Sequence, residues 1–332
     1  MPSKKNNKIT TSNNCLVIVV ALGSPTKIDV KSIKDFLRVF LSDRRVVDLP
    51  RVLWYPILYG IILPLRSKKL LHKYQQTAIN NQSALVYHAN DQIKQLAKHN
   101  PGIDIQLAYS YVDPSVAQVL DNYYADNQTY PQSILILPTF PQFSSSTVLP
   151  VFDQLTMYFK PKSILPSVKF ISSFATHPQY IAKIVQSIRN SWSVDGKSDV
   201  LLLSFHSIPV KMVASGDSYY AECYATYELI RQELELTVDI CKISFQSKFG
   251  GAKWLEPSTL DTVNQLTQEK VKHLSVICPG FMQDCLETLE EINIELRDKF
   301  MGNGGEKFTY IPCLNATDDG ISVLNQIIQN NL

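Results

Sequence analysis

The alternation of short apolar runs with longer amphipathic stretches constrains this chain more than any other feature of its sequence. Strands that alternate with helices form parallel sheets with helices on both faces, and uninterrupted apolar runs are typical of strands buried in such sheets. The runs that predict strands are 15–22, 105–110, 133–138, 168–173, 199–205, 241–246, 273–278 and 308–312. Helical patterns occur between them, for example at 30–41, 114–124, 178–192, 219–235, 258–270, 284–300 and 318–330.

This pattern occurs twice, which predicts an α/β protein with two doubly wound, Rossmann-like halves. A weak seam at 160–168 separates an expected N-terminal half, 15–165, from a C-terminal half, 166–332, and the last helix is expected to pack back on the first half. Residues 1–14 are polar and are predicted to be a disordered tail rather than a secretory signal. Ligands of open α/β sheets bind at the carboxyl ends of strands, so the cleft between the halves is the expected site.

The composition excludes some classes of function. The chain has 332 residues, of which 45% are apolar, so it can bury a large core. Its 32 basic and 30 acidic residues give a net charge of +2, which leaves no electrostatic footprint for nucleic acid. The densest apolar stretch, 52–65, is shorter than the roughly 18 to 20 residues of a membrane-spanning helix and contains prolines. It is therefore expected to lie on a membrane surface rather than to cross a membrane.

The cysteines form no CxxC pair. In the absence of an export signal we expect a cytoplasmic protein, peripheral to the inner membrane face at most, with free thiols. An iron–sulfur cluster assembled from distant cysteines is the alternative, which the sequence leaves open. The six cysteines are Cys15, Cys223, Cys241, Cys278, Cys285 and Cys313.

The first candidate site residue is His206, which follows the strand predicted at 199–205. It lies within SFHSIP, at the sheet edge where a ligand would bind. Imidazole exchanges a proton near neutral pH, so His206 is suited to general acid–base chemistry. A capping or structural histidine is an equally good interpretation of this position alone.

The second candidate site is a row of carboxylates that follows the strand predicted at 273–278. Pro279 and Gly280 end that strand, and a helix is expected to begin near Asp284. At about 100° per residue, four carboxylates fall within an arc of roughly 80°, and we call them the acidic row: Asp284, Glu287, Glu291 and Glu295. A solvated helix face is the simpler interpretation. Like charges four residues apart repel each other, however, so a ladder that carries protons or hydrated cations is the alternative.

Two further loops also follow predicted strands. The loop PQFSSSTV, at 141–148, combines an aromatic residue with small hydroxyl residues and suits either a ligand loop or a helix entry. The turn LGSP, at 22–25, resembles an anion-binding loop, although no GxGxxG or GxxxxGK[ST] motif occurs in the chain.

Together these segments resemble the ferrochelatase family over nearly the whole chain. An ordered set of matches of this length is highly specific. It implies the class II chelatase-like fold, in which the parallel sheets of two Rossmann-like halves face a central porphyrin cleft. The resembling stretches are LGSP (22–25), FLSDRRVVDLPRVLWYPILYGIILPLRSKK (40–69), PQFSSST (141–147), SFHSIP (204–209), GDSYYAEC (216–223), SFQSKFG (244–250), WLEP (254–257), CPGFMQDCLETLEEI (278–292) and YIPCLN (310–315).

The resemblance implies an enzyme that inserts ferrous iron into protoporphyrin IX, with release of two protons, to form protohaem. His206 matches the family's catalytic histidine and Glu287 matches the glutamate that faces it, and both are implied metal contacts. Asp284, Glu291 and Glu295 match the acidic row and are implied to relay protons or metal. Iron is then a substrate, and no cofactor is required.

The resemblance also implies how the partners bind. The partners are protoporphyrin IX and ferrous iron, and the chain is expected to be a monomer or homodimer. Residues 52–65 match a hydrophobic lip at the mouth of the cleft that can touch the membrane. The likeness is closest to proteobacterial-type members, which favours protoporphyrin over coproporphyrin. The implied porphyrin contacts are Ser24, Pro25, Leu53, Tyr55, Tyr111, Phe143, Ser144, Ser146, Thr147 and Phe281.

One loop departs from the family pattern. Where the family has Gly-Gly-Ser-Pro-Leu, residues 81–85 read NQSAL, so the porphyrin contacts there are expected to differ. This departure supports one alternative, a catalytically silent paralogue that binds porphyrin or haem. A chelatase that loads another metal into another tetrapyrrole is a second alternative.

Overall fold

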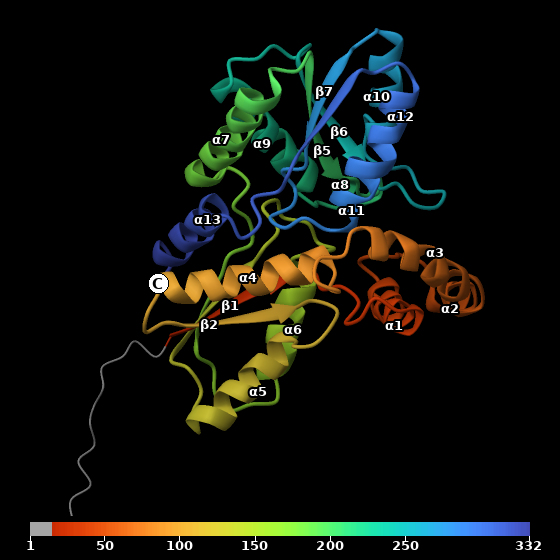
Figure 1. The fold of residues 1–332 in the computed structure, drawn as a ribbon. Helices are drawn as coiled ribbons and strands as arrows, with labels where there is room; N and C mark the ends of the chain where they lie inside the picture. Colours follow the sequence, from red (N-terminus) through yellow and green to blue (C-terminus); the bar gives the residue numbers. More distant parts are fainter. Residues whose placement is uncertain (1–14) are drawn as a thin grey trace, which may run out of the picture.

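The computed structural model describes residues 15–332 and contains two four-stranded parallel sheets, one in each half of the molecule (Figure 1). The first sheet consists of β1 (Cys15–Ala21), β2 (Asp104–Tyr109), β3 (Ser133–Pro138) and β4 (Ser167–Phe170) in the order β2-β1-β3-β4. The second consists of β5 (Val200–His206), β6 (Cys241–Gln246), β7 (His273–Ile277) and β8 (Lys307–Ile311) in the order β6-β5-β7-β8. The predicted tail, 1–14, lies outside the described residues.

The strand predictions are confirmed, and only the fourth strand differs by more than one residue at an end. The central strands were recognisable because their side chains are buried on both faces of the sheet, as in β1 and β5. The first sheet extends past the boundary predicted between residues 165 and 166. β4 pairs in parallel with β3, with Ser167 opposite Ser133, so the first half extends through Phe170. The apparent seam at 160–168 is the loop that leads into this partly exposed edge strand.

In the first half, α4 (Ala84–His99) and α5 (Val116–Asn127) pack against the sheet, whereas α1 (Val30–Leu41) and α3 (Leu63–Gln76) pack on each other. Side-chain caps fix the start of several helices; for example, Asp29 accepts a hydrogen bond from the Ser32 amide at 2.7 Å. The π-helical turn η1 interrupts the apolar segment between α2 and α3. The helices are α1 (Val30–Leu41), α2 (Arg51–Ile57), η1 (Leu58–Ile62), α3 (Leu63–Gln76), α4 (Ala84–His99), α5 (Val116–Asn127) and α6 (Leu149–Phe159).

The second half contains a correction to the predicted helix at 284–300. This segment is divided into a short helix, a π-helical turn in which the Glu295 amide donates to the Glu290 carbonyl at 2.8 Å, and a second short helix. The helices of this half are α7 (Pro178–Asp195), α8 (Val210–Ala214), α9 (Tyr219–Glu233), α10 (Thr259–Gln268), α11 (Leu286–Leu289), η2 (Glu291–Leu296), α12 (Arg297–Gly302) and α13 (Asp318–Gln329).

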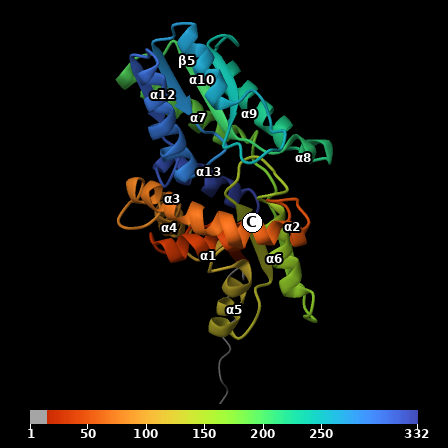
Figure 2. The ribbon, with the colours of Figure 1, turned by 90° about the vertical axis from the view of Figure 1, so that its right-hand side faces the viewer.

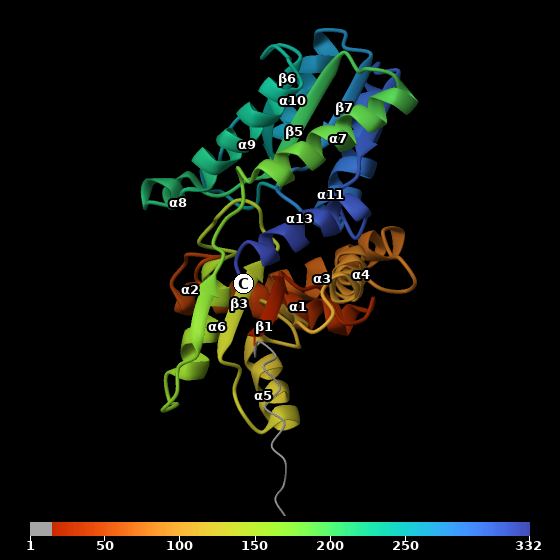
Figure 3. The same ribbon diagram turned by 90° about the vertical axis from the view of Figure 1, so that its left-hand side faces the viewer.

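The two halves share one apolar core and are joined by the last helix. α13 packs against α7 of its own half and against α4 of the first half, as the sequence predicted (Figures 2 and 3). The Gln92 side chain on α4 donates to the Asn315 carbonyl at 2.8 Å, and the Asn100 side chain donates to Asn325 at 2.8 Å. Within the described residues, no helix is both long and apolar enough to span a membrane.

The strand orders place one topological switch point in each sheet. In the first sheet the chain leaves β1 for β2 and then returns to the other side of β1 as β3, so the crevice lies between the ends of β1 and β3. The same order recurs in the second sheet, between β5 and β7. The four loops singled out in the sequence follow these four strands.

Candidate active site

A cavity lies where segments of the two halves meet. Its wall includes Ser24 from the turn after β1, Tyr74 from α3 and Glu287 from α11. Gly23, with φ +95°, shapes that turn, because a Cβ there would lie 2.7 Å from Val112 Cγ2. Ser83, Ala84 and Leu85, from the loop that departs from the family pattern, also line the cavity. The structure therefore brings the predicted residues Ser24 and Glu287 to one cavity.

Glu287 lies in the first turn of α11, where the positive end of the helix dipole favours negative charge. The Gln246 side chain holds its backbone by donating to the Glu287 carbonyl at 2.8 Å. Burial, reinforced by the nearby Glu287 charge, raises the pKa of Tyr74. Burial lowers the pKa of Arg66, and Glu287 opposes that shift. The sequence analysis did not identify Tyr74 or Arg66 as neighbours of Glu287.

His206 ends β5 and is half-buried. Its Nδ1 lies 2.6 Å from the Ser207 carbonyl oxygen, which can only accept a hydrogen bond, so Nδ1 carries the proton and donates. In the neutral imidazole this leaves the lone pair on Nε2. His206 is therefore held in the tautomer whose Nε2 can accept a proton.

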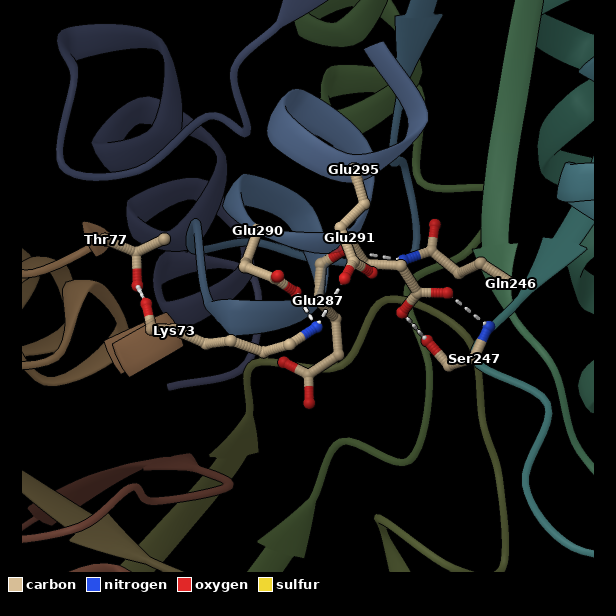
Figure 4. Close-up of polar contacts among 8 residues, drawn as sticks. All are labelled: Lys73, Thr77, Gln246, Ser247, Glu287, Glu290, Glu291 and Glu295. Atoms are coloured by element: carbon tan, nitrogen blue, oxygen red, sulfur yellow. Dashed lines mark hydrogen bonds and ion pairs between the residues drawn. The ribbon is translucent and has the colours of Figure 1, made fainter. Parts of the chain in front are cut away.

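Glu291 lies near both candidate catalytic residues. It accepts hydrogen bonds from the Ser247 amide at 2.8 Å and from the Ser247 hydroxyl at 2.5 Å (Figure 4). Burial raises the pKa of Glu291; Ser247 and His206 oppose this shift, and the charge of Glu287 adds to it. The carboxylate of Glu291 is thus within electrostatic range of both His206 and Glu287.

The outer end of the acidic row has a partner that the sequence did not reveal. Lys73 on α3 donates to Glu295 Oε1 at 2.8 Å and to Glu290 Oε2 at 2.7 Å. Glu290 was not among the predicted residues, because a regular α-helix would place it outside the row. The base that pairs with this end of the row therefore comes from a distant helix and not from the segment that carries the carboxylates.

Asp284 does not belong to the row. It precedes α11, is buried, and accepts hydrogen bonds from the Asn315 side-chain amide at 2.7 Å, the Thr288 hydroxyl at 3.0 Å and the Tyr310 hydroxyl. A buried carboxylate with these donors is an anchor for the start of α11. Its predicted place on one helical face with Glu287 is wrong, because the helix begins only at Leu286.

Replacing Asp284 by alanine should lower the free energy of unfolding by about 3 kcal/mol, because three buried donors lose their acceptor. Chemical denaturation measures this change. Asp319→Ala is the control, since Asp319 forms a partly exposed ion pair with Lys183 and its loss should cost less than about 1 kcal/mol. Equal losses in the two variants would show that Asp284 is not an anchor.

The predicted hydroxyl loop after β3 joins the two halves. Asp217 accepts hydrogen bonds from the Ser144 hydroxyl at 3.2 Å and from the amide and hydroxyl of Ser145, both at 2.7 Å. Ser146 contacts the Ser144 hydroxyl at 3.0 Å, and the Thr147 hydroxyl donates to the Ser144 carbonyl at 3.3 Å. Asp217 lies within the stretch GDSYYAEC (216–223), to which the sequence analysis assigned no contact.

The other implied porphyrin contacts are spread over several environments. Tyr111 is buried and its hydroxyl donates to Asp43 at 3.0 Å, whereas the Phe143 amide donates to Glu222 at 2.8 Å. Leu53 and Tyr55 are exposed on α2. Pro25, in the turn after β1, is buried, and Phe281, after β7, is partly buried.

The cysteines near the site are buried thiols. Burial raises the pKa of four of them well above the usual value, and iron–sulfur clusters are held by thiolates. Within residues 15–332, no three His, Cys, Asp or Glu side chains are grouped to hold a metal ion. The four cysteines are Cys223, Cys278, Cys285 and Cys313.

The fold resembles that of solved chelatase structures. SirB from Bacillus subtilis with Fe3+ matches 95% of this chain over 94% of its own length, with a TM-score of 0.58 and 8% identity. CbiX, described as the terminal enzyme for siroheme biosynthesis in denitrifying bacteria, matches 95% of this chain over 99% of its own length, with a TM-score of 0.53 and 12% identity. These likenesses confirm the class II chelatase-like fold.

Sequence comparison then identifies the family. A family profile described as Ferrochelatase matches residues 16–332. The ferrochelatases of Yersinia pestis (strain Pestoides F) and Yersinia pseudotuberculosis (serotype O:3, strain YPIII) are each 41% identical to it over 316 residues, which cover 95% of this chain and 98% of each relative. The chain belongs to the ferrochelatase family, which confirms the resemblance inferred from its motifs.

Proposed function

We propose that this chain is a protohaem-forming ferrochelatase, which inserts Fe2+ into protoporphyrin IX and releases two protons. One observation supports the proposal: in a chain of this family, Glu287 lines the cavity, and Glu291 is within electrostatic range of both Glu287 and His206. Iron is the substrate, and no further cofactor is required.

The chemistry of metal insertion matches these residue types. The free-base ring must lose two pyrrole protons before a divalent metal can enter its plane. His206 can accept a proton at Nε2 because Nδ1 is engaged with Ser207. We infer that Glu287 acts from the cavity side and that Glu291 passes protons outward or metal inward. Carboxylate and imidazole ligands suit a metal that must be released quickly, whereas thiolates would hold it.

Anaerobic turnover of the purified chain with Fe2+ and protoporphyrin, followed by loss of free-base fluorescence, tests this function. Many turnovers per chain are expected. Porphyrin binding with at most one metallation per chain would instead indicate a silent carrier. Activity confined to another metal with sirohydrochlorin would indicate a different chelatase.

We also propose that the hydrophobic lip, residues 52–65, contacts a membrane surface at the cytoplasmic side and receives the apolar porphyrin there. On α2, η1 and α3 this segment exposes several large apolar side chains, including Val52 at 85%, Leu65 at 68% and Leu53 at 63%. Exposed apolar patches of this kind mark interaction surfaces, and amphipathic helices bind in the plane of the interface. We therefore propose a monomer, or a homodimer formed through another face.

The double substitution Leu53→Ser and Leu65→Ser should weaken binding to anionic lipid vesicles at least tenfold. Burying one leucine contributes about 1.5–3 kcal/mol, so losing two exceeds the 1.4 kcal/mol of a tenfold change. Vesicle co-sedimentation measures the effect. Met157→Ser, at an exposed apolar side chain on α6, is the control and should bind as the wild type does. Unchanged binding of the double variant would exclude the lip as the contact.

A further inference from the structure

The ammonium group of Lys73 lies where the acidic row meets solvent. Its Nζ is 2.7 Å from Glu290 Oε2 and 2.8 Å from Glu295 Oε1, and it reaches both from α3 in the other half of the molecule (Figure 4). The Lys73 side chain is 19% exposed, Glu290 is 7% exposed and Glu295 is 51% exposed. One cation therefore occupies the space between two carboxylates at the edge of the site.

The π-helical turn makes this double contact possible. In a regular α-helix, residues five apart point about 140° away from each other, so one ammonium could not contact both Glu290 and Glu295 easily. In η2 the Glu295 amide donates to the Glu290 carbonyl at 2.8 Å, which closes the wider i→i+5 turn and brings the two side chains to one face. The π-helical turn thus places the two carboxylates close enough for Lys73 to contact both.

The electrostatics keep Lys73 charged. Burial acts to lower the pKa of Lys73, but Glu290 and Glu295 outweigh it and raise the pKa. Burial acts to raise the pKa of Glu295, and Lys73 outweighs it in the opposite direction. The Glu290 side chain is only 7% exposed, so a negative charge there is costly unless a cation is paired with it.

We propose that Lys73 is a built-in cation that closes the outer end of the acidic row, so that divalent metal reaches Glu287 and Glu291 but not Glu295. The role in delivering metal to the site rests on the proposed function. Mn2+ and Mg2+ favour carboxylate ligands, and a divalent ion approaching Glu290 and Glu295 would meet the ammonium at repulsive range. Within residues 15–332, the hydrogen bonds of Glu291 come from the neutral Ser247, and no lysine or arginine forms an ion pair with it. Lys73 is thus a positioning residue rather than a catalytic one.

Mn2+ binding, followed by electron paramagnetic resonance without porphyrin or iron, tests the proposal. Lys73→Met and Lys73→Gln should each bind one more Mn2+ per chain than the wild type, and Lys73→Arg should not. Adding Glu295→Gln to Lys73→Met should abolish the extra site, whereas Glu295→Gln in the wild type should leave Mn2+ binding unchanged. Lys211→Met is the matched control, because Lys211 also forms an ion pair between the halves, with Asp48 at 2.5 Å, and should gain no site.

Two results would overturn the proposal. If Glu295→Gln removes a Mn2+ ion from the wild type, the outer end is already open to metal. If neither Lys73→Met nor Lys73→Gln gains a site while circular dichroism shows both folded, the ammonium is not what excludes the cation. If both Lys73 variants unfold, Mn2+ binding to Glu295→Gln alone decides: unchanged binding supports the proposal, and the loss of one Mn2+ ion overturns it. These measurements need no turnover, so they are separate from the test of ferrochelatase activity.

Discussion

Replacing Glu287 by glutamine should reduce the turnover number for iron insertion by about 10³-fold while porphyrin binding stays within a factor of two to three. The magnitude is that of removing a positioned acid–base group, which contributes about 10²- to 10⁴-fold. Glutamine has nearly the same shape as glutamate, so the cavity wall is kept and only the charge is lost.

The structure indicates why the fold should tolerate this change. The position of Glu287 is set by its backbone, since the Gln246 side chain donates to its carbonyl and the anchor Asp284 holds the start of α11. Figure 4 shows its carboxylate turned away from the contacts that Lys73 makes with Glu290 and Glu295. The loss of charge should therefore affect the reaction rather than the stability of the chain.

Steady-state turnover and porphyrin fluorescence quenching, measured on the same preparation, separate the two effects. Glu228→Gln is the matched control: it removes the same charge on α9, where Glu228 pairs with Arg231, and should leave turnover unchanged. Near-normal turnover of Glu287→Gln would contradict the role assigned to this residue.

The sequence predicted those features that depend on local pattern. The strands were evident because buried parallel strands are continuous apolar runs, and the positions of His206 and Glu287 followed because switch-point loops come directly after such strands. The row of carboxylates was recognised in part. Its members Glu287 and Glu291 lie near each other in the structure, so the charge of Glu287 helps to raise the pKa of Glu291.

The remaining features depend on contacts between distant segments or on irregular backbone. Nothing near Glu295 in the sequence indicates Lys73, and nothing near Ser144 indicates Asp217. The sequence analysis assumed 100° per residue, which does not hold in the π-helical turn at 291–296. For this reason it did not place Glu290 near Glu295. Asp284 was placed on the row because the helix was expected to begin near it, whereas α11 begins only at Leu286 and Asp284 is held by Thr288 and by donors from β8 and the loop that follows it.

His206→Ala should also abolish insertion, with a fall of about 10³-fold in turnover and little change in the Michaelis constant for porphyrin. The reason lies in the tautomer. Because Nδ1 donates to the Ser207 carbonyl at 2.6 Å, Nε2 is free to take a pyrrole proton, and a methyl side chain offers no acceptor in its place.

A structural histidine and a proton acceptor give different results when imidazole is added. If His206 accepts the proton, imidazole in solution should restore a measurable fraction of the turnover of His206→Ala, increasingly as the pH rises and more of the imidazole is neutral. His99→Ala is the control, because the exposed His99 also contacts a backbone carbonyl through Nδ1, at 2.9 Å from Gln95, but lies far along α4 at its end. Most of the wild-type activity in His206→Ala, or a loss that imidazole never restores together with a lowered unfolding temperature, would reduce His206 to a structural role. Rescue by imidazole would place the proton transfer at the end of β5.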